Sequence, residues 1–236
     1  NSIIETKHNN QSMNSDFAIL YRTNAQSRAM EEALRKKDIP YRIYGGTSFY
    51  QRKEIKDLLA YCRLVINPDD EEALKRVINY PARGIGKTSM ERISLTANEN
   101  NVSMWKVISS DALNNLQINS GAKSKVRNFV DLIRNFQLQQ DKKNAYELVE
   151  DIAKSSTILS DLFADKTPEG IARYDNIQEL LNGIKDFVDN SETENETKSL
   201  AVFLQDIALL TDADNDKDND PNKVSLMTIH ASKGLE

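Results

Sequence analysis

Residues 17–24 read Phe17-Ala-Ile-Leu-Tyr-Arg-Thr-Asn24, a short apolar run that ends in three polar side chains. The residues that follow, 25–37, are rich in good helix formers, and Asn24 is placed to cap that helix. Residues 41–44 then alternate like a strand, and two glycines break the chain after them. This order predicts a βαβ unit whose first strand is buried on both faces of a parallel sheet.

After the glycines the apolar periodicity becomes helical and stays so. The first stripe stops at Asn67-Pro68 and consists of Ile55, Leu58, Leu59, Cys62, Val65 and Ile66. Similar stripes recur as far as Ile207 and predict a helical domain of roughly 150 residues. Residues 224–229 alternate again like a strand. The fold class predicted is therefore α/β, with a parallel-sheet domain interrupted by a large, mainly helical insertion.

Composition fits a globular, helix-rich protein of one large domain or two small ones, with 236 residues, 39% hydrophobic and 28% charged. The single cysteine, Cys62, allows no internal disulfide, and no segment resembles a signal peptide or a membrane span. We therefore expect a cytoplasmic protein that makes no membrane contact and has Cys62 buried.

The net charge of −5 argues against nucleic acid until its distribution is considered. Between residues 73 and 92 there are five bases and one acid, whereas residues 211–220 hold five aspartates and one lysine. Such segregation favours one local DNA-facing surface and a solvated acidic loop over 211–221, although plain charge scatter stays open. The alternating aspartates lack the glycine and glutamate of a calcium loop, and no metal site is predicted elsewhere.

Residues 84–89, Gly-Ile-Gly-Lys-Thr-Ser, look like the end of a phosphate-binding P-loop. The first glycine of that motif is replaced by Pro81, and no apolar strand precedes it, so we exclude this assignment. We predict instead a turn between two helices, the second opening at Thr88 with a capping box to Glu91. Backbone N–H groups there, with Arg83 and Lys87, could bind the backbone of duplex DNA, and a plain helix connection is the alternative.

Two polar segments end predicted strands. Arg22 and Asn24 follow the first strand, at the edge where α/β sheets bind ligands, although a capping asparagine beside a surface arginine is the alternative. Residues 228–236, Thr-Ile-His-Ala-Ser-Lys-Gly-Leu-Glu, follow the last strand with a polar set that core packing would not tolerate without partners. No catalytic triad and no supported pair of catalytic carboxylates is present, so we predict no catalytic residue in this chain.

Four segments together resemble the later motifs of the UvrD/PcrA/Rep helicases of superfamily 1, in the same order. They are residues 19–28, 45–57, 83–86 and 226–236. The resemblance spans nearly the whole chain. It implies that residues 14–50 and 222–236 belong to a partial RecA-like motor domain, 2A, and that residues 51–221 form its inserted helical domain, 2B, after a polar arm over 1–13.

The resemblance also implies roles for single residues. Contacts with single-stranded DNA are made by the family residues that match Arg22, Asn24, Thr228 and His230. Duplex DNA is held by the family residues that match Arg83, Gly84, Ile85, Gly86, Lys87 and Thr88. The family lysine that matches Lys233 helps to couple the nucleotide state to the DNA contacts. The family glutamate that matches Glu236 reaches the ribose of ATP.

The Walker motifs of the family are missing from this sequence, and hydrolysis needs that whole set around phosphate and Mg²⁺. The resemblance thus implies a monomeric, ATP- and Mg²⁺-dependent 3′-5′ DNA helicase of repair or replication as the parent, while this piece binds no nucleotide and hydrolyses none. Two alternatives stay open: a helical module that docks repair or transcription proteins, and part of a helicase-nuclease of the AddA/RecB kind.

Overall fold

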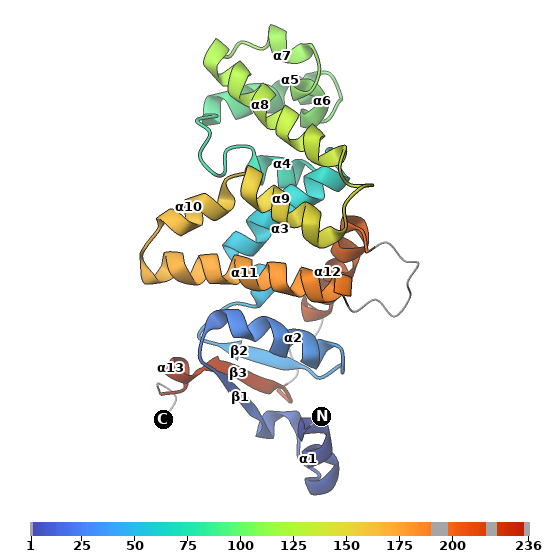
Figure 1. The fold of residues 1–236 in the computed structure, drawn as a ribbon, viewed down its shortest axis with the longest axis vertical. Coiled ribbons are helices and arrows are strands. Elements are labelled where there is room, and N and C mark those ends of the chain that lie inside the picture. Colours follow the sequence, from blue (N-terminus) through green and yellow to red (C-terminus); the bar gives the residue numbers. More distant parts are fainter. Residues whose placement is uncertain (1, 190–197, 216–220, 234–236) are drawn as a thin grey trace.

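The computed structural model describes residues 2–189, 198–215 and 221–233, and for residues 210–215 it describes the backbone alone. A small sheet with its flanking helices lies at one end of an elongated molecule, and a larger group of helices lies at the other (Figure 1). In the part of the chain that is described, no helix is both long and apolar enough to cross a membrane.

The sheet has three parallel strands in the order β1-β3-β2: β1 (Ala18–Tyr21), β3 (Val224–Thr228) and β2 (Tyr41–Tyr44). The last strand of the chain therefore lies between the first two. Tyr21 is paired in register with Thr228, and Tyr44 with Met227, so all three strands end at the same edge. The chain leaves the sheet after β2, forms the helical part, and returns to complete the sheet at its centre.

The prediction that β1 is buried on both faces is wrong. Ala18 is exposed and Leu20 is 52% exposed, whereas Tyr21 on the opposite face is buried. Helices must cover both faces to bury a parallel strand fully, and within the described residues only one face of β1 is covered.

Short helices surround the sheet: α1 (Ser2–Asn10), η1 (Asn14–Asp16), η2 (Asn24–Gln26), α2 (Ser27–Arg35) and α13 (Ile229–Ser232). Residues 2–10, expected to be part of a polar arm, form a helix, whose Ile3 packs against the small core of Tyr21, Leu34, Val224 and Leu226. The Lys7 ammonium on this helix also donates to Asn14 Oδ1 of η1, so an apolar and a polar contact join α1 to the sheet domain.

The helical part contains, in chain order, η3 (Phe49–Gln51), α3 (Lys53–Ile66), α4 (Glu71–Val77), α5 (Lys87–Glu99), α6 (Met104–Ile108), α7 (Ala112–Asn115), α8 (Ser120–Gln137), α9 (Ala145–Ser155), α10 (Ile158–Ala164), α11 (Pro168–Asp189) and α12 (Leu200–Asn215). Its core is a second cluster of buried side chains, separate from the core under the sheet. Phe49 and Tyr50 already belong to this core, so it begins slightly before the predicted boundary at residue 51.

Helix α3 lies at the centre of the helical part and carries the first predicted stripe. Five of its six members are buried, and Ile66 at the end is 37% exposed. Cys62 is fully buried, and burial raises the pKa of its thiol to about 12. The loop predicted over 211–221 is corrected in part, because α12 continues to Asn215; residues 216–220 lie outside the described range.

Buried polar side chains join the two parts of the molecule. The Arg28 guanidinium on α2 contacts Glu32 on its own helix and Glu179 on α11, at 2.9 Å each. Arg52, between η3 and α3, donates to Ser27 Oγ at 2.7 Å and to Asn176 Oδ1 of α11 at 2.8 Å. Charged groups are costly to bury without partners, so these contacts of Arg28 and Arg52 fix how α11 lies over α2.

Candidate nucleic-acid interface

The polar residues that follow β1 and β3 lie at one edge of the sheet. Parallel pairing of Tyr21 with Thr228 brings the residues after both strands together, and Arg22, Asn24 and His230 are all exposed there. Carboxyl edges of parallel sheets are where α/β domains bind ligands. The segments that follow β1 and β3 therefore begin side by side at this edge.

Thr228 has a structural task at this edge. Its Oγ1 accepts a hydrogen bond from the Ala231 N–H at 3.0 Å, which caps α13 and points the helix away from the strand. The turn after β2 packs against α13 at the same edge. Gly45 in this turn has φ +71°, and a Cβ on it would lie 3.1 Å from the Cβ of Ala231. A glycine is needed here for both the backbone conformation and the close approach.

Asn24 does not serve as the helix cap expected of it. The turn after β1 is closed by Gln26, whose Oε1 accepts from the N–H groups of Arg22 (2.9 Å) and Thr23 (3.2 Å). Asn24 instead lines a cleft between the sheet edge and the first half of α11, together with Thr47 and Arg173. Sequence reasoning missed Arg173, because nothing local places residue 173 beside residue 24.

Lys233 is exposed just after α13, on the same side of the sheet as His230. Glu236, assigned to the ATP ribose by resemblance, lies outside the described residues. The described residues contain no group of three or more His, Cys, Asp or Glu side chains that could hold a metal ion. The Lys233 ammonium is of a kind that can bind a phosphate.

The second candidate segment is the loop of residues 78–86 between α4 and α5, called the α4–α5 loop below. Its fold depends on Asn79, whose Oδ1 accepts from the backbone N–H of Arg83 (3.0 Å) and of Ile85 (2.9 Å). Ile85 is 1% exposed and anchors the loop in the helical core. Asn79 was not among the predicted site residues, because its role depends on the shape of the folded loop and no local sequence pattern indicates it.

Arg83 points inward rather than toward solvent. Its guanidinium donates to the carbonyl oxygens of Tyr80 (2.9 Å), Val77 (3.0 Å) and Ser156 (3.3 Å) and packs 5.3 Å from the Phe129 ring centre. It also donates to the hydroxyl of Tyr61, a group whose pKa burial raises to about 12. As placed, Arg83 supports the loop, and it does not present the outward charge that the sequence suggested.

Asn79, Ala82, Gly84 and Gly86 are exposed in the loop, and Lys87 and Thr88 are exposed in the first turn of α5. The predicted capping box at Thr88 is wrong: α5 begins at Lys87, and its N-cap is Gly86, which supplies no side-chain acceptor. The N–H groups of the first turn are thus left for another acceptor. The Lys87 side chain is 91% exposed and lies 3.8 Å from Glu91.

The two glycines differ in what requires them. Gly84 has φ +69°, a conformation that disfavours a side chain. Gly86 has an ordinary φ of −74°, and a Cβ on it would meet nothing within 4 Å. Glycine is common at an N-cap, the position that Gly86 occupies, and here it leaves open space above the N-terminus of α5.

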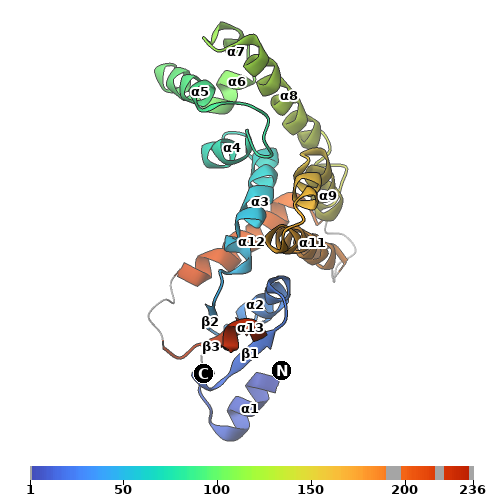
Figure 2. The same ribbon diagram turned by 90° about the vertical axis from the view of Figure 1, so that its left-hand side faces the viewer.

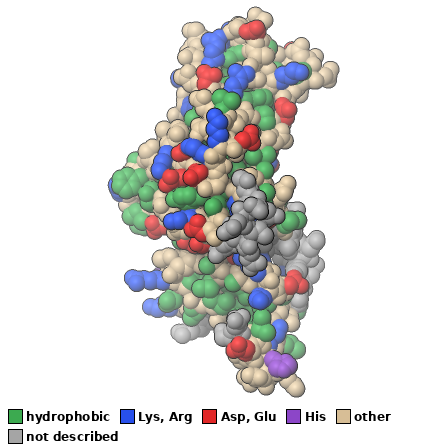
Figure 3. All heavy atoms as spheres, turned by 45° about the vertical axis from the view of Figure 1, so that its right-hand side comes forward, with side chains coloured by type: hydrophobic (Ala, Val, Ile, Leu, Met, Phe, Trp, Pro, Cys, Tyr) green, Lys and Arg blue, Asp and Glu red, His purple; other side chains and the backbone are tan. Residues whose placement is uncertain are grey.

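The sheet edge and the α4–α5 loop lie on one side of the molecule. Figure 2 looks onto this side, with α13 near the bottom and the loop above α3 and α4. On the face in Figure 3, basic and acidic side chains are interspersed over the helical part and do not gather by sign. Figure 3 shows a different side, so the candidate interface is defined by the position of the sheet edge and the α4–α5 loop.

A small parallel sheet with exposed polar residues after its strands, joined to a larger helical part inserted between β2 and β3, makes this an α/β protein with a large helical insertion. The family model for the UvrD-like helicase C-terminal domain matches residues 1–236, and the chain belongs to this family.

Similar proteins include the ATP-dependent DNA helicases PcrA of Bacillus subtilis and Leuconostoc citreum. The first is 42% identical over 94% of this chain, and the second is 43% identical over 98% of it. The Staphylococcus aureus (strain Mu50) PcrA is 39% identical over 94%. The chain spans 30% of the Bacillus subtilis relative and 31% of the Leuconostoc citreum one, so it corresponds to about a third of a PcrA helicase.

Proposed function

We propose that this chain is the DNA-contacting portion of an ATP-dependent 3′-5′ DNA helicase, holding single-stranded DNA at the sheet edge and duplex DNA at the α4–α5 loop. The proposal is supported mainly by one observation: Arg22, Asn24 and His230 are exposed at a common edge, on the side of the molecule where the loop exposes Gly84, Gly86 and Lys87. A DNA strand separated from its partner near the loop would have a path to the edge.

The sheet edge suits a single strand. An arginine, an asparagine and a histidine there can bond phosphate and sugar oxygens without reading base sequence, and Thr228 fixes the direction of α13 beside them. A motor that moves along any sequence needs contacts of this kind. The cleft beside Asn24 gives the strand a second wall on α11.

The α4–α5 loop suits a duplex backbone. It offers the free N–H groups of the α5 N-terminus, open space at Gly86 and the Lys87 ammonium, all exposed. We assign Arg83 and Ile85 to the support of this loop, because both are directed into the helical core. Thr88 is exposed at the first turn of α5 and stays a proposed contact.

ATP and Mg²⁺ belong, on this proposal, to the intact helicase. ATP supplies the energy for strand separation, and Lys233 at the sheet edge relays nucleotide state to the adjacent DNA contacts. The chain alone is proposed to hydrolyse no ATP, because its sequence has no Walker motif. We assign residues 14–50 and 222–236 to domain 2A and residues 51–221 to domain 2B, in a monomeric cytoplasmic helicase of DNA repair or replication.

The test uses a full-length helicase that contains this chain, with Arg22→Ala, Lys87→Ala and the control Lys185→Ala, an exposed lysine on α11. Each variant is titrated by fluorescence anisotropy against single-stranded and blunt duplex DNA, without nucleotide. We expect Arg22→Ala to weaken single-strand binding alone, and Lys87→Ala to weaken duplex binding alone.

Equal losses on both ligands, or none, would contradict the division of tasks. If Arg22→Ala leaves DNA affinity unchanged and alters only the affinity for ATP, the phosphate that Arg22 meets belongs to the nucleotide.

A further inference from the structure

Helix α8 approaches the α4–α5 loop through one side chain. The Lys125 Nζ lies 3.4 Å from the carbonyl oxygen of Gly84, and a Cβ built on Gly84 would lie 2.5 Å from that nitrogen. Lys125 is exposed, and among the residues that the structure describes no carboxylate forms an ion pair with it. Its charge therefore faces the solvent directly above the loop.

The first half of α8 is locally basic in a protein of net charge −5. Residues 112–130 contain Lys123, Lys125 and Arg127 and no acid. Gly121, Lys125 and Asn128 are spaced four and three residues apart, so they share one helix face, and all three are exposed. This face is small, polar and free of acids, which suits a neighbouring phosphate backbone.

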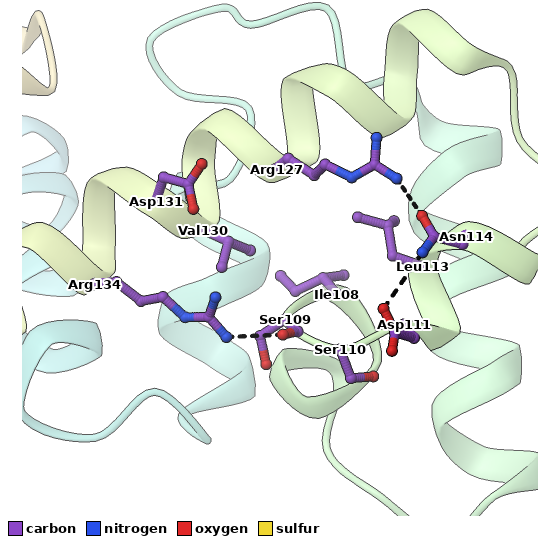
Figure 4. Close-up of a pocket in the computed structure, with 10 residues that line it drawn as sticks. All are labelled: Ile108, Ser109, Ser110, Asp111, Leu113, Asn114, Arg127, Val130, Asp131 and Arg134. Carbon is purple, nitrogen blue, oxygen red and sulfur yellow. Dashed lines mark hydrogen bonds between the residues drawn. The ribbon is translucent and has the colours of Figure 1, made fainter.

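The opposite flank of α8 shows what the other cations do. Figure 4 shows Arg127 and Arg134 reaching from α8 over the connection between α6 and α7. Arg127 bonds Asn114, and Arg134 donates to the Ser109 carbonyl oxygen at 2.8 Å, with Asp111 and Asp131 lining the same pocket. These arginines therefore bind α8 to the segment between α6 and α7, and two acids lie beside them.

We propose that Lys125 is a second duplex contact: its ammonium binds a phosphate of the DNA backbone that the α4–α5 loop holds, so that duplex DNA is gripped by α5 and α8 together. This inference rests on the proposed function and extends the same site to a second helix. A lysine ammonium is a mobile point charge, so the contact is indifferent to base sequence. The Gly84 carbonyl keeps the ammonium over the loop until a phosphate replaces that weak acceptor.

The test measures duplex binding of the full-length helicase by anisotropy across a potassium chloride series. Each phosphate contact that is lost reduces the slope of log K against log salt by about 0.9. We expect Lys125→Ala to show that reduction and to bind about threefold or more weakly at low salt. Lys125→Arg should keep the slope, as should Lys185→Ala, the matched exposed lysine in the middle of a helix.

Lys125→Gln separates a phosphate contact from simple support of the loop, because glutamine can still donate to the Gly84 carbonyl but carries no charge. It should behave like Lys125→Ala. Wild-type binding by Lys125→Gln would overturn the proposal. Unchanged binding by Lys125→Ala beside a loss in Lys87→Ala would overturn it while leaving the proposed function intact, whereas no loss in either variant would overturn both.

Discussion

The α4–α5 loop and the sheet edge both expose polar groups on the same side of the molecule, but they are held in shape in different ways. The loop is shaped by the side chains of Asn79, Arg83 and Ile85, and on the proposed function it offers mainly backbone groups to a ligand. The edge is shaped by the backbone pairing of β1 with β3 and offers side chains, Arg22 and His230 among them. In both places polar side chains support the backbone, Asn79 and Arg83 at the loop and Gln26 and Thr228 at the edge. The loop differs because its supporting set includes a charged side chain.

The largest effect should come from Arg83→Ala. The carbonyl oxygens of Val77, Tyr80 and Ser156 lose a charged donor, and Phe129 loses the guanidinium packed on its ring. We expect the free energy of unfolding to fall by about 2–4 kcal/mol, measured by urea denaturation. Arg92→Ala, at an exposed position on α5, should change it by less than about 0.5 kcal/mol.

Cys62 provides an independent readout of the same change. Because its thiol is buried and has a pKa raised to about 12, at pH 8 it stays protonated and should react with iodoacetamide only when the helical core opens. Labelling should be faster in Arg83→Ala than in the wild type. Equal labelling and equal stability would mean that Arg83 is free to bind DNA, as the sequence first suggested.

The two loop glycines give an intermediate effect that sharpens the contrast. Gly84→Ala forces a side chain into φ +69° and against Lys125, and should cost about 1–2 kcal/mol of stability. Gly86→Ala should leave stability within about 0.5 kcal/mol yet weaken duplex binding, because its methyl group enters space that only a ligand would fill. Thermal unfolding and duplex anisotropy on both variants distinguish the two; the reverse pattern would refute this account of the loop.

At the sheet edge the expected loss of stability is smaller than at Arg83 or Gly84. Thr228→Val removes the acceptor for the Ala231 N–H and should cost about 1 kcal/mol in thermal unfolding. Thr228→Ser, which keeps the hydroxyl, serves as the control. Single-strand affinity is measured on the same two variants at a temperature where both are folded. If Thr228→Val then binds single-stranded DNA more weakly than Thr228→Ser, Thr228 also contacts the DNA.

Much of the fold and part of the site could be predicted from the sequence. The stripe from Ile55 to Val65 is buried as its spacing predicts, and the strand at 224–228 joins the first two in one parallel sheet. Strand direction places Arg22 and His230 at the same edge of the sheet, since parallel strands end there, whereas the pairing of β1 with β3 was decided by the structure. The open face of β1 could not be foreseen, because an apolar run does not reveal how many layers cover it.

Local patterns thus specified which segments are helix or strand and which polar residues follow them, because periodicity and turn residues act over a few positions. Contacts between distant segments decided the rest. Tyr61 and Phe129 turn Arg83 inward, and Lys125 reaches the Gly84 carbonyl from another helix. A side chain's direction depends on partners brought close by folding of the whole chain, so the same basic residue can support a loop or face DNA.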